Sequence, residues 1–74
     1  MTKKIFEIVA RIMGVQVDVV SEHSSPENLA NWDSLRHMKL ILALEESLGI
    51  QFTEAQIVGV RSVKDILELI QTKA

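Results

Sequence analysis

The sequence predicts an all-α protein, a four-helix bundle with a long loop between the first two helices and a short third helix. Two observations favour this fold class. Apolar residues recur at helical spacing along most of the chain, in runs separated by glycines and polar segments. A single stretch, Val15–Val20, alternates as a β-strand would, and one strand without a partner cannot form a stable sheet.

The amino-acid composition limits the classes of function that the protein can have. The 74 residues, 1–74, are expected to form one domain with a small core. The absence of cysteine excludes a disulfide framework, a thiolate metal site and a cysteine nucleophile. The net charge of −2 argues against a nucleic-acid binder, which needs a basic stripe, and no apolar run approaches the ~18 residues of a membrane span. We therefore expect a free-standing, cytoplasmic and monomeric protein that binds neither nucleic acid nor a membrane.

The first helix is predicted from about Thr2 or Lys3 to Met13. Its apolar residues fall at positions i, i+1, i+4, i+7 and i+8, which share one face of a helix. They are Ile5, Phe6, Val9, Ile12 and Met13. Gly14 follows and can adopt the left-handed conformation that ends many helices.

A long connection, residues 15–33, separates the first two helices. Val15–Val20 is expected to be an extended loop that packs valines onto the helices. Ser21–Asn31 is polar, and Ser25 is expected to cap a single turn that tucks Leu29 inward. Loops longer than about 12–15 residues are uncommon in compact domains and are often functional.

The second helix is predicted from Ser34 to about Leu48, with Asp33 or Ser34 as its N-cap and Gly49 at its end. It carries two apolar stripes about 140° apart around its axis. The first consists of Leu40, Ile41, Leu44 and Leu48, and the second of Leu35, Met38 and Leu42. One stripe suffices for a helix that rests on a core. The second is either buried, because the helix lies centrally in the bundle, or exposed as a docking surface for a partner.

A capping pattern predicts the short third helix. Thr53 and Gln56 fit a capping box, in which each side chain bonds the backbone of the other residue. The helix is expected to run through about Val58, with Ile57 facing inward and Gly59 ending it.

The fourth helix is predicted to begin in a similar way, because Ser62 is followed three residues later by Asp65. Apolar residues then recur at i, i+3, i+4 and i+7. The expected buried face consists of Val63, Ile66, Leu67 and Ile70.

Four segments, in this order, resemble the acyl carrier protein family. They are Asp33-Ser34-Leu35, Ala43-Leu44-Glu45-Glu46, Gly49-Ile50-Gln51-Phe52 and Val63-Lys64-Asp65-Ile66. The resemblance covers nearly the whole chain and includes the long first loop. It implies a four-helix bundle in which a serine carries a covalent 4′-phosphopantetheine arm, which a phosphopantetheinyl transferase donates from coenzyme A.

By this resemblance Ser34 is the attachment residue, Asp33 takes part in transferase recognition, and Leu35 and Met38 lie on the recognition helix. The thiol of the arm carries an acyl, or in relatives an aminoacyl, group as a thioester between loading and transfer enzymes. A phosphodiester at Ser34 would lie by free backbone N–H groups at the positive end of a helix, where negative charge is favoured.

The first turns of the second helix are basic, whereas those of fatty-acid carriers are usually acidic. Arg36, His37 and Lys39 occupy them. Arg36 and Lys39 are either ordinary solvated charges or contacts for the phosphate of the arm or for an acidic partner. We therefore expect a specialised carrier, for a secondary metabolite, a modified lipid or an amino acid, rather than the housekeeping carrier of fatty-acid synthesis. The predicted partner interface consists of Asp33, Leu35, Arg36, Met38, Lys39 and Leu42.

Trp32 is the only tryptophan and directly precedes the Asp-Ser-Leu segment. It either anchors the loop to the bundle or lines the exit of the arm. The anchor is favoured, because an aromatic side chain of this size is usually buried.

An unmodified helical adaptor that binds a partner through Leu35, Met38 and Leu42 is the alternative function. Catalysis by the chain itself is not expected. Its two histidines, His23 and His37, have no evident partners for a triad or a metal site.

Overall fold

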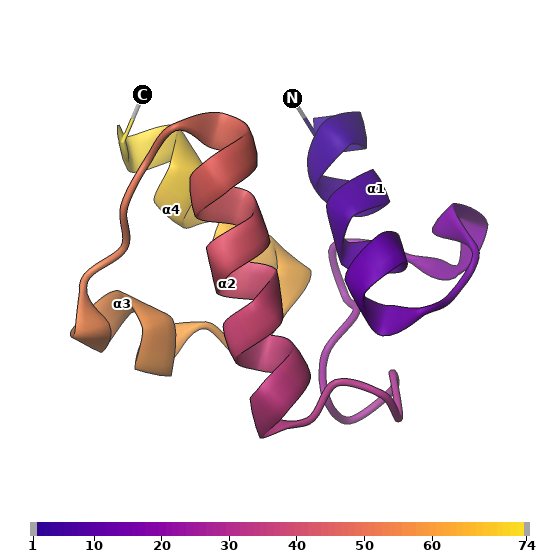
Figure 1. Ribbon diagram of the computed structural model, residues 1–74. Helices are drawn as coiled ribbons and strands as arrows, with labels where there is room; N and C mark the ends of the chain where they lie inside the picture. Colours follow the sequence, from indigo (N-terminus) through magenta and orange to yellow (C-terminus); the bar gives the residue numbers. More distant parts are fainter. Residues whose placement is uncertain (1, 74) are drawn as a thin grey trace.

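The computed structural model describes residues 2–73, in which four α-helices and one short 3₁₀-helix form a bundle (Figure 1). The elements are α1 (Thr2–Met13), η1 (Val17–Val19), α2 (Ser34–Leu48), α3 (Glu54–Gly59) and α4 (Val63–Lys73). This described part of the chain contains no β-strand. The predicted all-α fold, with its long first connection and short third helix, is therefore confirmed.

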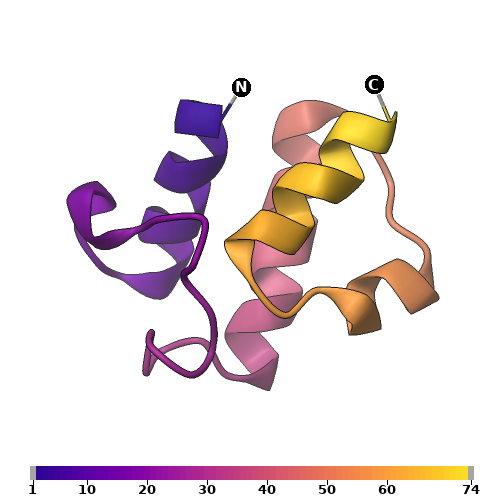
Figure 2. The same cartoon turned by 180° about the vertical axis from the view of Figure 1, so that it is seen from behind.

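The beginning of α2 lies at one end of the molecule, and the beginning of α1 and the end of α4 lie at the other (Figures 1 and 2). α1 packs against both α2 and α4. The short α3 runs across the bundle at the level of the first turns of α2 (Figure 1). This arrangement leaves the loop-to-helix junction at residues 31–35 at an end of the bundle rather than in its middle.

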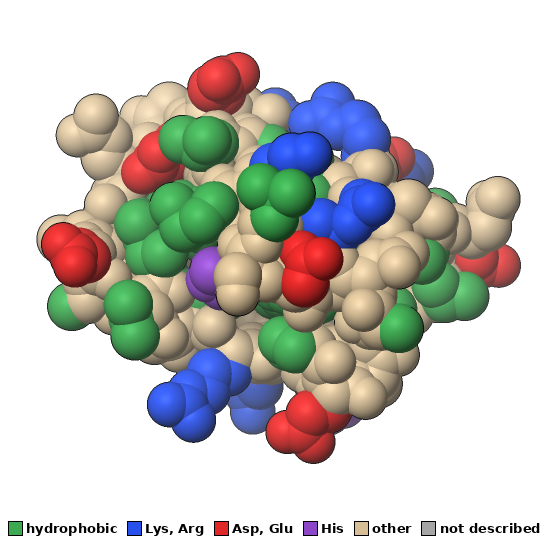
Figure 3. All heavy atoms as spheres, turned by 60° about the horizontal axis from the view of Figure 1, so that its bottom comes forward, with side chains coloured by type: hydrophobic (Ala, Val, Ile, Leu, Met, Phe, Trp, Pro, Cys, Tyr) green, Lys and Arg blue, Asp and Glu red, His purple; other side chains and the backbone are tan. Residues whose placement is uncertain are grey.

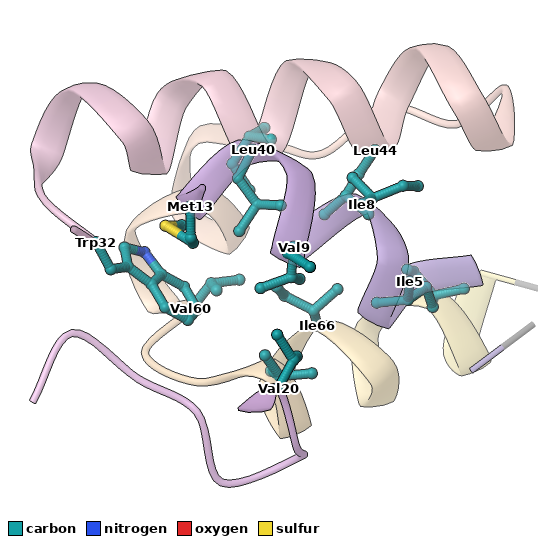
Figure 4. Packing of buried hydrophobic residues seen from close by; sticks show 14 of the residues in the cluster. Ile5, Ile8, Val9, Met13, Val20, Trp32, Leu40, Leu44, Val60 and Ile66 are labelled. Carbon is teal, nitrogen blue, oxygen red and sulfur yellow. The ribbon is translucent and has the colours of Figure 1, made fainter. Parts of the chain in front are cut away.

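The core is one cluster of apolar side chains to which all four α-helices or their flanking segments contribute. α2 contributes the first predicted stripe, because Leu40, Ile41 and Leu44 are fully buried and Leu48 is partly buried. Figure 4 shows Leu40 and Leu44 of α2 facing side chains of α1, with Trp32 at the end of the core nearest Met13. Burial of apolar surface stabilises a fold by ~25 cal/mol per Å², so burial of this stripe holds α2 against the rest of the bundle.

The buried face of α1 differs from the predicted one. Phe6 and Ile12 of the predicted stripe are partly buried and pack against the core, whereas Ile8 and Ala10, which lie outside that stripe, are buried. The helix packs against α2 and α4, so its buried face is wider than the predicted stripe, although both are centred on Val9. The buried residues are Ile5, Ile8, Val9, Ala10 and Met13.

Glycines end both long helices as predicted. Gly14 and Gly49 have φ values of 70° and 65°, in the left-handed region that glycine adopts without strain. The amide of Val15 then donates to the carbonyl of Ala10 over 3.0 Å, which satisfies one of the carbonyls left unpaired in the last turn of α1.

The first half of the long connection is not the extended loop that we expected. Val17–Val19 forms a 3₁₀ turn, and Val17 and Val19 are exposed rather than packed on the helices. Val20 is the valine that enters the core. A turn shortens the segment, so that successive side chains no longer alternate between two faces as they do in an extended chain.

The second half of the connection behaves as predicted and also holds α4. The amide of Leu29 donates to the carbonyl of Ser25 over 2.9 Å, and Leu29 packs against the core. The carbonyls of Ser24 and Glu22 each accept a hydrogen bond of 2.9 Å from amides of the first turn of α4. The loop therefore satisfies backbone donors that a helix start leaves free.

Capping residues begin the last two helices. Thr53 and Gln56 form both hydrogen bonds of the predicted capping box at the start of α3. At α4, Ser62 accepts a hydrogen bond from the amide of Asp65, but the Asp65 carboxylate accepts from the amide of Arg61 instead of that of Ser62. The box is thus present in a modified form.

The end of α3 lies at a glycine, where the sequence predicts it. Gly59 is the last residue of α3 and does not have a positive φ, so it is not a left-handed stop. The next residue, Val60, has extended backbone and is buried in the core. The helix thus ends at the predicted glycine, and the buried side chain of Val60 returns the chain to the bundle.

Replacing a leucine by alanine should affect stability very differently in the two stripes of α2. Leu44→Ala removes a fully buried side chain, so it should lower the free energy of unfolding by roughly 2–5 kcal/mol. Leu42→Ala removes an exposed one and should change it by no more than about 0.5 kcal/mol. Urea unfolding followed by circular dichroism measures both. Equal losses would show that the two stripes are buried alike in solution.

Candidate functional site

Asp33 is the N-cap of α2, and Ser34 is the first helical residue. Asp33 has extended backbone, and its Oδ1 accepts a hydrogen bond of 2.8 Å from the amide of Arg36. Of the two N-cap residues that the sequence left open, the structure therefore selects Asp33. The cap fixes the direction in which the chain enters the helix, and Ser34 follows it directly.

The side chain of Ser34 is exposed, and within residues 2–73 its hydroxyl makes no hydrogen bond. The amides of Ser34 and Leu35 belong to the first turn, which lacks preceding carbonyls, and no acceptor for them occurs in the described part of the chain. An attached phosphodiester fits this position, because free N–H groups and the positive end of the helix both favour negative charge.

Arg36 contacts a neighbouring helix. Its Nη1 donates to the carbonyl of Ile12 over 2.7 Å, and Asn31 Nδ2 donates to the carbonyl of Met13 over 2.9 Å. Both carbonyls belong to the last turn of α1, where no further helical amide can pair with them. Arg36 is therefore partly buried and joins the start of α2 to the end of α1, a role that the sequence did not indicate.

His37 joins the start of α2 to α3. The indole Nε1–H of Trp32 donates to His37 Nδ1 over 3.0 Å, and His37 Nε2 lies 2.9 Å from the carbonyl oxygen of Ile57. Both ring nitrogens are thus engaged within the protein, which leaves neither free to act on Ser34. Trp32 is only 4% exposed and anchors the loop as expected, and its side chain also borders the groove described next.

A groove of about 550 Å³ lies between α2 and α3 and opens beside Ser34. Its walls are mainly apolar and include Trp32, His37 and Met38 on one side and Ile57 and Val58 on the other. Sequence reasoning did not find it, because periodicity does not tell how far apart two helices lie.

The second apolar stripe of α2 is exposed, which excludes the alternative that both stripes are buried. The exposed fractions are 64% for Leu35, 45% for Met38 and 54% for Leu42. Val58 of α3, at 72%, adds a further exposed apolar side chain that the sequence did not single out. Lys39 is also exposed. Figure 3 views the end where α2 begins and shows hydrophobic side chains gathered around a histidine, with basic side chains nearby.

Residues 2–73 contain neither a metal-binding cluster nor a membrane-spanning helix. No group of three or more His, Cys, Asp or Glu side chains that could hold a metal ion occurs in residues 2–73. His23 is exposed and lies 3.6 Å from the carboxylate of Glu22. No helix within the described range is long and apolar enough to cross a membrane.

Comparison with known proteins shows the family of the chain. Residues 3–70 match the protein family described as "Phosphopantetheine attachment site". The chain is 38% identical over 72 residues to the acyl carrier protein of Thermosynechococcus vestitus, an alignment that covers 96% of this chain and 88% of that protein.

Two further relatives are acyl carrier proteins of other bacteria. The protein from Coprothermobacter proteolyticus is 31% identical over 74 residues, with 95% of this chain and 90% of the relative covered. The protein from Syntrophobacter fumaroxidans is 29% identical over 68 residues, with 92% and 84% covered. Because the family match and these alignments span nearly the whole chain, the protein belongs to the acyl carrier protein family, whose phosphopantetheine attachment domain holds a covalently bound 4′-phosphopantetheine.

Proposed function

We propose that Ser34 is the attachment residue and that the protein presents an acyl or aminoacyl group to partner enzymes. The observation that carries this proposal is the exposed, unbonded hydroxyl of Ser34 at the first position of α2. When bound, the phosphopantetheine supplies a terminal thiol that holds the cargo as a thioester. The chain has no cysteine, so it has no thiol of its own that would compete.

The residues around Ser34 position the attachment site and take no part in a reaction. Asp33 holds the first turn through the Arg36 amide, which keeps Ser34 at the helix start. Arg36 and His37 hold the same turn against α1 and α3. The chain therefore acts as a carrier, and the phosphopantetheinyl transferase and the loading and transfer enzymes supply the reactions.

The exposed stripe Leu35, Met38 and Leu42 is proposed as the docking surface for these enzymes. Three apolar side chains at i, i+3 and i+7 are the anchors that helix-in-groove recognition uses. Methionine adapts its shape to several partners. Asp33 is exposed beside the stripe and is proposed to take part in transferase recognition.

The basic first turns of α2 support a carrier for a specialised pathway rather than for housekeeping fatty-acid synthesis. Lys39 is exposed and carries this argument. Arg36 carries less of it, since its guanidinium donates to the Ile12 carbonyl and so has a structural role as well. In this proposal the carrier is monomeric and cytoplasmic, and residues 1–74 form its one domain.

Attachment should depend on Ser34 alone. Incubation of the wild type with coenzyme A, Mg²⁺ and a broad-specificity transferase should add one phosphopantetheine, and Ser34→Ala should add none, as intact-mass spectrometry would show. Asp33 remains as the cap, so the variant should stay folded. Ser47→Ala is a matched control on the exposed side of α2 and should be modified as the wild type is. A wild type that stays unmodified would favour the unmodified adaptor instead.

Met38 should matter more for partner binding than for stability. Met38→Ala should slow transfer of the arm roughly five- to tenfold, the effect of losing a contact worth about 1 kcal/mol or more. Because the side chain is about half exposed, the free energy of unfolding should change little. Kinetics with the transferase and urea unfolding separate the two effects. Large destabilisation with normal transfer kinetics would place Met38 in the core.

Lys39 should make the protein a poor substrate for enzymes that serve acidic carriers. Such enzymes are expected, from the family resemblance, to present basic patches that Lys39 repels, and charge at a docking surface acts mainly on encounter rate. Lys39→Glu should raise the rate of acyl transfer by a fatty-acid synthesis enzyme at low salt. The gain should shrink at high salt, because exposed charges are screened over ~8 Å at physiological ionic strength.

The control for Lys39→Glu is Lys3→Glu, which makes the same charge change in α1, at the opposite end of the molecule from the start of α2 (Figure 1). If both variants raise the rate equally, net charge rather than the docking surface is responsible. If neither does, the basic turn is solvated surface and the proposal of a specialised carrier loses its support.

A further inference from the structure

A chain of two hydrogen bonds lines the groove beside Ser34. The indole N–H of Trp32 donates to Nδ1 of His37 over 3.0 Å, and Nε2 of His37 lies 2.9 Å from the carbonyl oxygen of Ile57. The two rings are stacked, with centroids 6.2 Å apart and planes at 25°. All three residues border the groove. The chain thus joins the segment before α2, α2 itself and α3.

The two partners determine the protonation state of His37. An indole N–H can only donate and a carbonyl oxygen can only accept. Nδ1 of His37 must therefore be unprotonated, and Nε2 must carry the hydrogen that is donated to Ile57. One tautomer of the neutral imidazole satisfies both bonds, and the imidazolium cannot.

The geometry points to His37 as a positioning residue of the carrier site. In its neutral form it joins Trp32 to the end of α3 around the groove beside Ser34, and it loses the bond to Trp32 when the ring takes up a proton. The inference rests on the proposed function in one respect, because it takes the groove to be part of the site where a group is attached at Ser34. The hydrogen-bond chain itself needs no attached group.

Protonation would break the chain at Trp32. An Nδ1–H would face the Nε1–H of the indole, and two donors cannot bond each other. The indole is almost completely buried, so its N–H has no ready access to water and an unpaired buried donor is costly. The ring or the indole must then move. The chain is therefore complete only while His37 is neutral, and it is lost when the ring is protonated.

Few charged groups face His37. Among the described residues that border the groove, Asp33 is the only one with a formal charge beside His37, and its carboxylate accepts from the amide of Arg36. The Arg36 guanidinium is directed to the carbonyl of Ile12. On α3 the charged residue is Glu54, which does not border the groove. A structural response between pH 8 and 5 at this site is therefore assigned to His37.

The test uses the unmodified protein and two reporters. Trp32 is the only tryptophan, so the intrinsic emission of the protein reports on this site alone. Between pH 8 and 5 the emission should shift to longer wavelength, and the indole N–H should exchange with solvent faster.

Two variants separate positioning from general destabilisation. His37→Gln keeps one donor and one acceptor but cannot take up a proton, so it should hold Trp32 as the neutral histidine does and abolish the pH response. His23→Gln removes the other, exposed histidine and should leave the response unchanged. The spectrum of imidazole nitrogens in the wild type should show the Nε2–H tautomer for His37 at pH 8.

The inference is overturned if His37 gains a proton, as its nitrogen resonances show, while the Trp32 emission and the exchange rate of its indole N–H stay constant. It is also overturned if His37→Gln retains the wild-type pH response. Ser34→Ala should give the same pH response as the wild type, since the chain needs no arm. Failure of arm attachment at Ser34 and failure of the His37 chain are therefore observed in different experiments.

Discussion

Carbonyls at the ends of two helices determine where α2 begins in space. The last turn of a helix leaves carbonyls that no amide of the same helix can reach. Two consecutive residues of α2, Arg36 and His37, extend in different directions and donate to the carbonyls of Ile12 at the end of α1 and of Ile57 near the end of α3, and the Ile57 carbonyl also accepts from the amide of Val60. The first turn of α2, which includes Ser34, is thereby fixed to both neighbours.

This arrangement also explains a basic residue in an unfavourable place. A cation near the start of a helix is disfavoured by the dipole of that helix, by roughly 0.3–1 kcal/mol at an exposed site. Arg36 stands in the first turn of α2, but its guanidinium lies at the negative end of α1, where the same effect favours it. Arg36 therefore connects two helices and is not an ordinary surface charge, and Lys39, one turn further along α2, is exposed.

Local patterns predicted most of the fold, because helix periodicity, glycine stops and capping boxes each involve residues fewer than about ten positions apart. The stripe containing Leu40 and Leu44, the left-handed Gly14 and the Thr53 cap are all of this kind. The cap at Asp33 and the helix start at Ser34 were predictable for the same reason. The partners of Arg36 and His37 lie 24 and 20 positions away, and periodicity shows which face of a helix is buried but not which carbonyl lies opposite.

The helix ends have a geometric consequence for joining this domain to other proteins. α1 begins and α4 ends at the end of the molecule opposite to the start of α2 (Figure 1), and the longest dimension of the fold is 26 Å. A second domain fused ahead of α1 or after α4 would leave the face around Ser34 unobstructed. A flexible linker that spans this distance would also hold the fused domain at a high effective concentration relative to that face. The fold is therefore suited to tethering, because its free ends and its exposed serine do not compete for the same space.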